Sequence, residues 1–141
     1  MRTPCLSVIV AFHRMRRESH RTLHSLTSEY QRGIRSCDYE VIAVENPSDA
    51  MLSKDQVEGY GSNFRLMQMQ TPSLSPANAI NWAASRARGE YLMVLIDGAR
   101  ILSPGMLRFT LMAAKSHSNP VVSALAWHLG PKAQQESIRE G

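Results

Sequence analysis

The sequence of 141 residues has few of the features that mark secreted, zinc-binding or membrane proteins. It contains only two cysteines, Cys5 and Cys37, and neither belongs to a Cys-x-x-Cys pair. They are too few for a disulfide scaffold and give no support for a zinc ribbon or finger, so a reducing compartment is expected. No apolar run approaches the roughly 20 residues that a membrane-spanning helix needs.

The first apolar run, residues 6–12, is short, and most of the positive charge follows it instead of preceding it. This is the wrong order for a secretory signal. We therefore expect a soluble cytoplasmic domain, with association with a membrane surface left open. Charged residues make up 20% of the chain and hydrophobic residues 43%, which is ordinary for one globular domain. Residues 1–130 are expected to form this domain, and residues 131–141 a polar tail or linker.

The formal net charge is +4, and much of the basic excess lies in residues 13–21, His-Arg-Met-Arg-Arg-Glu-Ser-His-Arg. An anionic partner is one interpretation of this stretch: a phosphate, a nucleic acid or an acidic membrane surface. The other is the solvated face of a helix. Aromatic residues do not alternate with the basic ones, so a nucleic-acid binder is disfavoured.

Short runs rich in β-branched residues predict buried strands at residues 6–12, 39–44 and 91–96. Residues 64–69 alternate between apolar and polar, which is typical of a strand nearer the edge of a sheet. Residues 121–127 are a candidate fifth strand. Because helical patterns separate these runs, the sequence predicts a three-layer α/β/α sandwich with a mainly parallel sheet.

Three helices are expected between the strands. Apolar residues three and four apart predict a helix over 22–32 that begins near Arg17. A stripe of small residues predicts a second over 78–88, which can lie close to the sheet. Ser103 followed by Pro104 reads as an N-cap and first helical residue, opening a third helix through Lys115.

Polar residues follow three of the predicted strands. His13 comes after the first, Glu45 and Asn46 after the second, and Asp97 after the third. In parallel α/β sheets the ligand crevice lies outside the carboxyl ends of the strands. These side chains are therefore candidates for binding a ribose, a base or a metal, although an Asp at the end of a strand can also simply cap the next turn.

Three blocks of the sequence, in this order, resemble family 2 glycosyltransferases of the GT-A fold: SVIVAFHR, DYEVIAVENPSD and NWAASRARGEYLMVLIDGARILSPGML. The resemblance covers about residues 6–112. It implies a Rossmann-like GT-A sheet that binds a nucleotide diphosphate sugar, with UDP, GDP or dTDP as the nucleotide. The sugar would pass to an unknown acceptor: a saccharide, a lipid-linked group or a protein.

The resemblance also implies roles for individual residues. Ala11, Phe12 and His13 match the first loop, which lines the base, and Glu45 and Asn46 match the acidic pair that reads base and ribose. Residues from Ser75 to Asn78 match a loop that contacts base or phosphate, and Asn81 matches the asparagine of the ARN block. Gly98 and Arg100 complete the candidate donor-binding set beside Asp97.

Asp97 matches the first acid of the DxD motif, whose carboxylates hold a divalent cation between the two phosphates. Mg²⁺ or Mn²⁺ is thus the implied cofactor, and it would act as a Lewis acid on the departing diphosphate. Ala99 stands in place of the second acid, so metal binding is expected to be weak or absent, although one carboxylate can suffice when phosphates and water supply the other ligands. Arg100 either supplies part of the cation's role, since guanidinium pairs with phosphate, or is a surface arginine.

Other departures concern the activity itself. Pro47 stiffens a loop where the family has glycine, and Ile80 and Ala83 replace the Arg and Gly of the ARNxG pattern. Members of the family normally continue beyond the length of this chain, and the later part supplies the acceptor pocket and the catalytic base. The chain is therefore expected to be a donor-binding half or a natural short relative, with no catalytic base assigned. The alternative is a non-catalytic module that keeps the GT-A-like fold.

Overall fold

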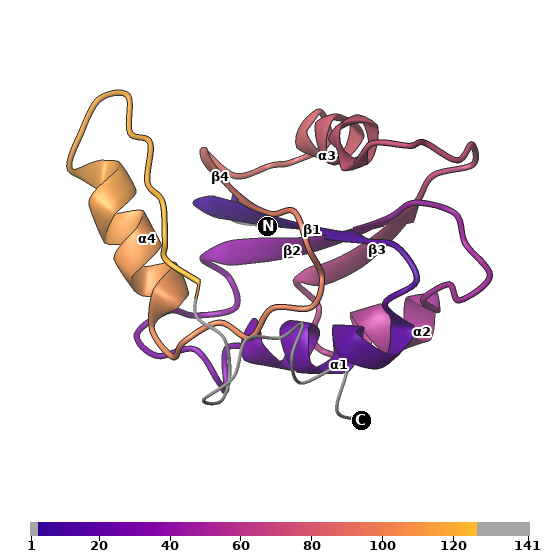
Figure 1. The fold of residues 1–141 in the computed structure, drawn as a ribbon. Helices are drawn as coiled ribbons and strands as arrows, with labels where there is room; N and C mark the ends of the chain where they lie inside the picture. Colours follow the sequence, from indigo (N-terminus) through magenta and orange to yellow (C-terminus); the bar gives the residue numbers. More distant parts are fainter. Residues whose placement is uncertain (1–2, 127–141) are drawn as a thin grey trace.

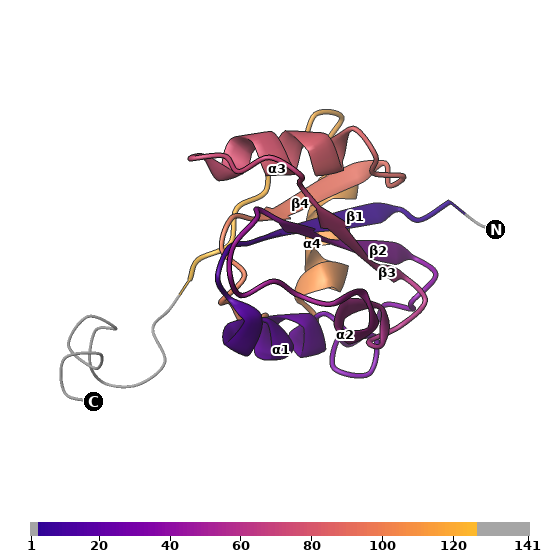
Figure 2. The ribbon, with the colours of Figure 1, turned by 90° about the vertical axis from the view of Figure 1, so that its right-hand side faces the viewer.

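The computed structural model of the chain describes residues 3–126, which form a parallel sheet covered by helices on both faces (Figure 1). The elements follow one another as β1 (Leu6–Phe12), α1 (Arg16–Ser25), β2 (Tyr39–Glu45), α2 (Lys54–Glu58), β3 (Phe64–Gln68), α3 (Pro76–Ala84), β4 (Tyr91–Leu95) and α4 (Met106–Lys115). Helix α3 lies on one face of the sheet, and α1 and α2 lie on the other (Figure 2). The predicted three-layer architecture is confirmed.

The four strands are parallel and lie in the order β3-β2-β1-β4. Leu6 at the start of β1 is level with Tyr39 of β2 and Tyr91 of β4, and Phe12 at the end of β1 is level with Glu45. Every residue of β1 and β2 is buried, because these central strands have helices above and below. The carboxyl ends of β1, β2 and β4 therefore meet at one edge of the sheet.

Successive residues of the strands point to opposite faces of the sheet, so alternate residues belong to two separate apolar clusters. One cluster packs Val8 and Val10 of β1 against Leu23 of α1 and Leu107 of α4. The other lies under α3, whose small residues Ala79 and Ala83 allow the close approach that the sequence predicted. Burial of these side chains is the main source of stability, at about 25 cal/mol per Å² of apolar surface.

The helix boundaries differ from the predictions. Helix α1 ends at Ser25 and not at Arg32, because Gln31 turns back and donates from Nε2 to the Ser25 carbonyl. Helix α3 begins at Pro76, with Ser75 as its N-cap, and ends at Ala84. The predicted Ser103 cap of α4 is wrong: Gly105 precedes the helix with a φ of 92°, which excludes residues 103–104 from it.

Two further predictions concern the end of the chain. Residues 121–126, the described part of the candidate fifth strand, form no strand, and Trp127 and the tail 131–141 lie outside the described residues. The longest helices between residues 3 and 126 have ten residues, and none of them could cross a bilayer.

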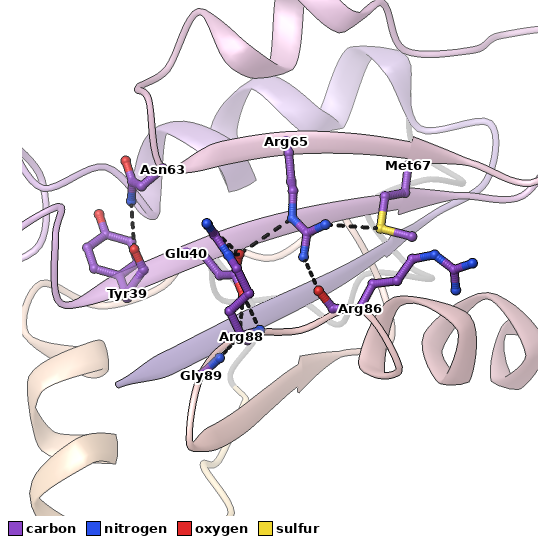
Figure 3. A network of polar contacts seen from close by, with 9 residues as sticks. Tyr39, Glu40, Asn63, Arg65, Met67, Arg86, Arg88 and Gly89 are labelled. Atoms are coloured by element: carbon purple, nitrogen blue, oxygen red, sulfur yellow. Dashed lines mark hydrogen bonds and ion pairs between the residues drawn. The ribbon is translucent and has the colours of Figure 1, made fainter. Parts of the chain in front are cut away.

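Glu40 near the start of β2 is the centre of a buried polar network (Figure 3). Its carboxylate accepts a hydrogen bond from the Ser7 hydroxyl at 2.7 Å. It also accepts two from Arg88, from the backbone N–H at 2.7 Å and from the side-chain Nε at 2.9 Å. Arg65 Nε lies 3.5 Å from the same carboxylate. Burial alone would raise the pKa of Glu40. The bonds from Ser7 and Arg88 and the charge of Arg65 outweigh burial, so the pKa lies below its ordinary value. The network fixes the turn that leads into β4.

Replacing Glu40 by Gln should lower the free energy of unfolding by about 1–3 kcal/mol at neutral pH, because an amide NH₂ would face the guanidinium of Arg88. Urea unfolding measures this. The effect should shrink as the pH falls from the ordinary glutamate pKa of 4.5 through the lower pKa of folded Glu40, because the unfolded wild type takes up a proton first and the folded carboxylate follows. Glu58→Gln, in an ion pair with Lys54 at 3.9 Å on the surface, is the control and should change stability by less than about 0.5 kcal/mol. Equal losses in both variants would contradict the role of the network.

Candidate functional site

A cleft of about 470 Å³ opens at the carboxyl edge of the sheet. It is lined mostly by apolar side chains from the ends of β1 and β2, the loop before α3, α3 itself and the residue after β4. The lining residues are Ala11, Phe12, His13, Met15, Asn46, Pro47, Pro72, Ser73, Leu74, Pro76, Ala79 and Ile96. The cleft lies where parallel α/β sheets bind ligands, and its volume suits a small molecule.

Asn46 joins three segments of the cleft wall. Its backbone N–H donates to the Phe12 carbonyl at 3.0 Å, which ties the end of β2 to the end of β1. Its side chain donates from Nδ2 to the Ser73 carbonyl at 2.6 Å and accepts the Ser73 N–H on Oδ1 at 2.9 Å. This two-way amide pairing, which we call the Asn46–Ser73 clamp, holds the loop before α3 against the end of β2.

The side chain of Glu45, the residue before Asn46, does not line the cleft. Both of its carboxylate oxygens accept the Leu52 N–H, at 2.9 and 3.1 Å, and Gln68 Nε2 donates to it at 3.2 Å. Burial raises the pKa of Glu45, and the bonds from Leu52 and Gln68 and the nearby His13 offset this only in part. The carboxylate thus shapes segment 46–52, and the structure does not place it beside His13 and Asn46 in the lining.

The segment after β4 is held by hydroxyl groups of α1. The Thr22 hydroxyl donates to the Gly98 carbonyl and accepts the Arg100 N–H at 3.1 Å, and Ser25 Oγ accepts the Leu102 N–H at 3.1 Å. Both hydroxyls are buried. The sequence motifs do not include these residues, although two small hydroxyl residues three apart within an apolar helical pattern are a usable signal.

Gly98 is buried directly against Phe12. A side-chain carbon at position 98 would overlap the aromatic ring, so only glycine allows the segment after β4 to pass this close to the end of β1. The contact brings two of the predicted site segments together. It also explains why Gly98 belongs to the site without offering a side chain.

Asp97 and Arg100 form an ion pair, and both line a second cleft. Arg100 Nη2 lies 3.5 Å from Asp97 Oδ2, and Asp97 Oδ1 accepts the Ala99 N–H at 2.8 Å. The second cleft, of about 1100 Å³, runs along β4 and α4 and is also lined by Arg21. Asp97 and Arg100 therefore do not line the same cleft as His13 and Asn46, but Ile96 borders both.

Ser75, Asn78 and Asn81 lie beside the first cleft without lining it. The Ser75 hydroxyl caps α3 by accepting the Ala77 N–H at 3.2 Å, and Asn78 Nδ2 donates to Ser73 Oγ at 3.0 Å. Asn81 is exposed on α3. Instead, the same loop offers Pro72, Ser73 and Leu74, which the sequence had marked only as a loop.

The basic stretch of residues 13–21 is largely surface. Arg14 pairs with Asp49 at 3.0 Å, and both side chains are mostly exposed. His20 is hydrogen-bonded through its two ring nitrogens to Tyr60 Oη and Gln56 Nε2, both at 3.1 Å. Within this stretch, His13 and Met15 line the first cleft, and Glu18 and Arg21 line the second.

The side chains present do not fit a resident divalent metal ion. Among residues 3–126 no group of three or more His, Cys, Asp or Glu side chains converges on one point. Asp97 and Glu18 are the acidic residues that line the second cleft, and the two oxygens of Asp97 already face the Ala99 N–H and Arg100. A cation there would have to compete with a guanidinium of like charge.

Comparisons with known proteins agree with the fold. The chain matches the profile of the family "Glycosyl transferase family 2" over residues 7–123. Among solved structures it is similar to the crystal structure of S. aureus TarS 1–349, with a TM-score of 0.64 and 22% sequence identity. That match covers 79% of this chain and 32% of the TarS chain, so this chain spans about a third of that length. None of the curated proteins matches the sequence.

Gly98→Ala should lower the free energy of unfolding by about 1–3 kcal/mol, because the added methyl group overlaps the Phe12 ring in a packed interior. Urea unfolding followed by circular dichroism measures the loss. Ala99→Ser, at the exposed neighbouring position, is the control and should be nearly neutral. A neutral Gly98→Ala would contradict the close approach of the two segments.

Glu45→Gln should gain stability relative to the wild type as the pH rises above the ordinary glutamate pKa of 4.5. The raised pKa of Glu45 means that the folded wild type binds its proton more tightly than the unfolded chain, so wild-type stability falls as the pH rises through the folded-state pKa. The amide of the variant does not titrate, so the variant does not lose stability in this way. Urea midpoints for both proteins between pH 4 and 8 test this, and a difference that does not vary with pH would contradict it.

Proposed function

This chain belongs to glycosyl transferase family 2, and we propose that it forms the donor-binding part of an enzyme that transfers a sugar from a nucleotide diphosphate sugar. One observation carries the proposal beyond family membership. The Asn46–Ser73 clamp holds one wall of the cleft at the carboxyl ends of β1 and β2, and Ile96 lines both this cleft and the second cleft, which Asp97 and Arg100 also line.

The first cleft suits the base of the nucleotide. Its walls are largely apolar and include Pro47, Pro72 and Leu74, against which a flat heterocycle can pack. Both the nitrogen and the oxygen of the Asn46 side-chain amide are hydrogen-bonded to the Ser73 backbone, so Asn46 acts mainly by holding the wall of the cleft in place. His13 is the exposed polar side chain in the lining, and it is available to a ribose hydroxyl or a base nitrogen.

The diphosphate would then extend past Ile96 toward the segment after β4. Ile96 borders both clefts, so a ligand that enters the first can reach the second without leaving the surface. Thr22 and Ser25 hold this segment from behind, which fixes its backbone before any ligand arrives. Because this segment is already ordered, less conformational entropy is lost when a ligand binds.

A non-catalytic nucleotide-binding module is the second candidate function. It is favoured by Ala99, which stands where a second acid would be expected, and by the use of the Glu45 carboxylate inside the protein. Both candidates require nucleotide binding in the first cleft. Transfer of sugar to an acceptor separates them.

Thermal unfolding with UDP, GDP and dTDP tests the proposal. At least one of these nucleotides should raise the Tm, because a ligand at about 100 times its Kd adds roughly 2.7 kcal/mol to the stability of a folded state that alone binds it. Asn46→Ala removes both side-chain bonds to Ser73 and should weaken the affinity by about tenfold. Asn78→Ala is the matched control: it loses one bond to Ser73 Oγ but does not line the cleft, and it should bind like the wild type. No response to any of the three nucleotides would overturn the proposal.

A further inference from the structure

The segment between β4 and α4 carries one carboxylate and one guanidinium, Asp97 and Arg100, beside the proposed donor site. We infer that Arg100, and not a divalent metal ion, supplies the positive charge that faces the donor's diphosphate. This inference rests on the proposed function and names the cation of that site. Two consequences can be tested: diphosphate binding needs Arg100, and it does not need a metal ion.

The carboxylate is poorly placed to recruit a metal ion. Asp97 Oδ1 accepts a hydrogen bond from the Ala99 N–H at 2.8 Å, and Arg100 Nη2 lies 3.5 Å from Asp97 Oδ2. A dication at Oδ2 would replace an existing charge pair and lie beside a guanidinium, so it gains little and is repelled. Ala99 offers no oxygen from its side chain to offset this.

Arg100 is held in place for an anionic ligand by its backbone. Its N–H donates to the Thr22 hydroxyl, which itself donates to the Gly98 carbonyl, so α1 fixes the residues on both sides of Ala99. The Arg100 side chain is 52% exposed and lines the second cleft together with Arg21. The backbone is thus rigid, and the guanidinium remains accessible to a ligand.

The contact with Asp97 does not consume the guanidinium. A guanidinium carries five N–H donors in a planar fork, and one nitrogen, Nη2, faces Asp97. The opposite side of the fork can still pair with two phosphate oxygens, which is the geometry that guanidinium and phosphate favour. Asp97 would then orient Arg100, and the pair together would replace the metal site that two acids form.

Isothermal titration of the full chain with UDP, GDP or dTDP, whichever raises the Tm, tests the metal requirement. The affinity in EDTA should be within about twofold of the affinity in Mn²⁺. A drop of more than about tenfold in EDTA would overturn the inference while leaving the proposed function intact. Failure of every nucleotide to bind in either condition would overturn both.

Arg100→Ala tests the requirement for the guanidinium. Because charge-assisted hydrogen bonds are strong, the variant should bind the diphosphate about 10–100-fold more weakly and the corresponding nucleoside, which has no phosphate, equally well. Arg32→Ala is the matched control: it removes the same charge from an exposed position that lines neither cleft, and it should bind like the wild type. Wild-type affinity in Arg100→Ala, or equal losses in both variants, would overturn the inference, and an unchanged Tm for each variant shows that the fold is intact.

Discussion

The parallel pairing of β1 with β2 on one side and β4 on the other is the constraint on which the site depends. Because the three strands start level with one another, their carboxyl ends meet at one edge. Phe12 is the centre of that edge: its carbonyl accepts the Asn46 N–H, and its ring lies against Gly98. No single segment contains the site, and the sheet brings its parts together.

Around this edge, neutral polar side chains set the positions of the loops. The amide of Asn46 holds the loop before α3, and the hydroxyls of Thr22 and Ser25 hold the segment after β4. Buried polar groups are costly unless they are hydrogen-bonded, so each of these contacts both stabilises the loop and restricts it to one position. The cleft is therefore formed before a ligand binds, which is a general property of small-molecule sites.

The charged side chains at the two ends of the sheet have different surroundings. At the amino end, Glu40 is surrounded by Ser7, Arg88 and Arg65, and its charge is stabilised within the protein. At the carboxyl end, Arg100 and Asp97 remain partly exposed and face a cleft. The first arrangement maintains the fold, whereas the second leaves charge accessible to a ligand.

The sequence by itself determined the four strands of the sheet, their parallel arrangement and the family, because β-branched runs, helical periodicity and ordered motif blocks are local patterns. It did not show that β4 is a half-exposed edge strand or that residues 121–126 form no strand. Tertiary structure alone decided how the candidate side chains are used: Glu45 turns inward to Leu52, Ser75 caps α3, and Asp97 faces Arg100. The end of α1 and the cap of α4 were also mispredicted, since Gln31 and Gly105 act through contacts and backbone angles that no periodicity encodes. A motif fixes which residues reach the edge of the sheet, whereas the direction of each side chain depends on partners that are distant in sequence.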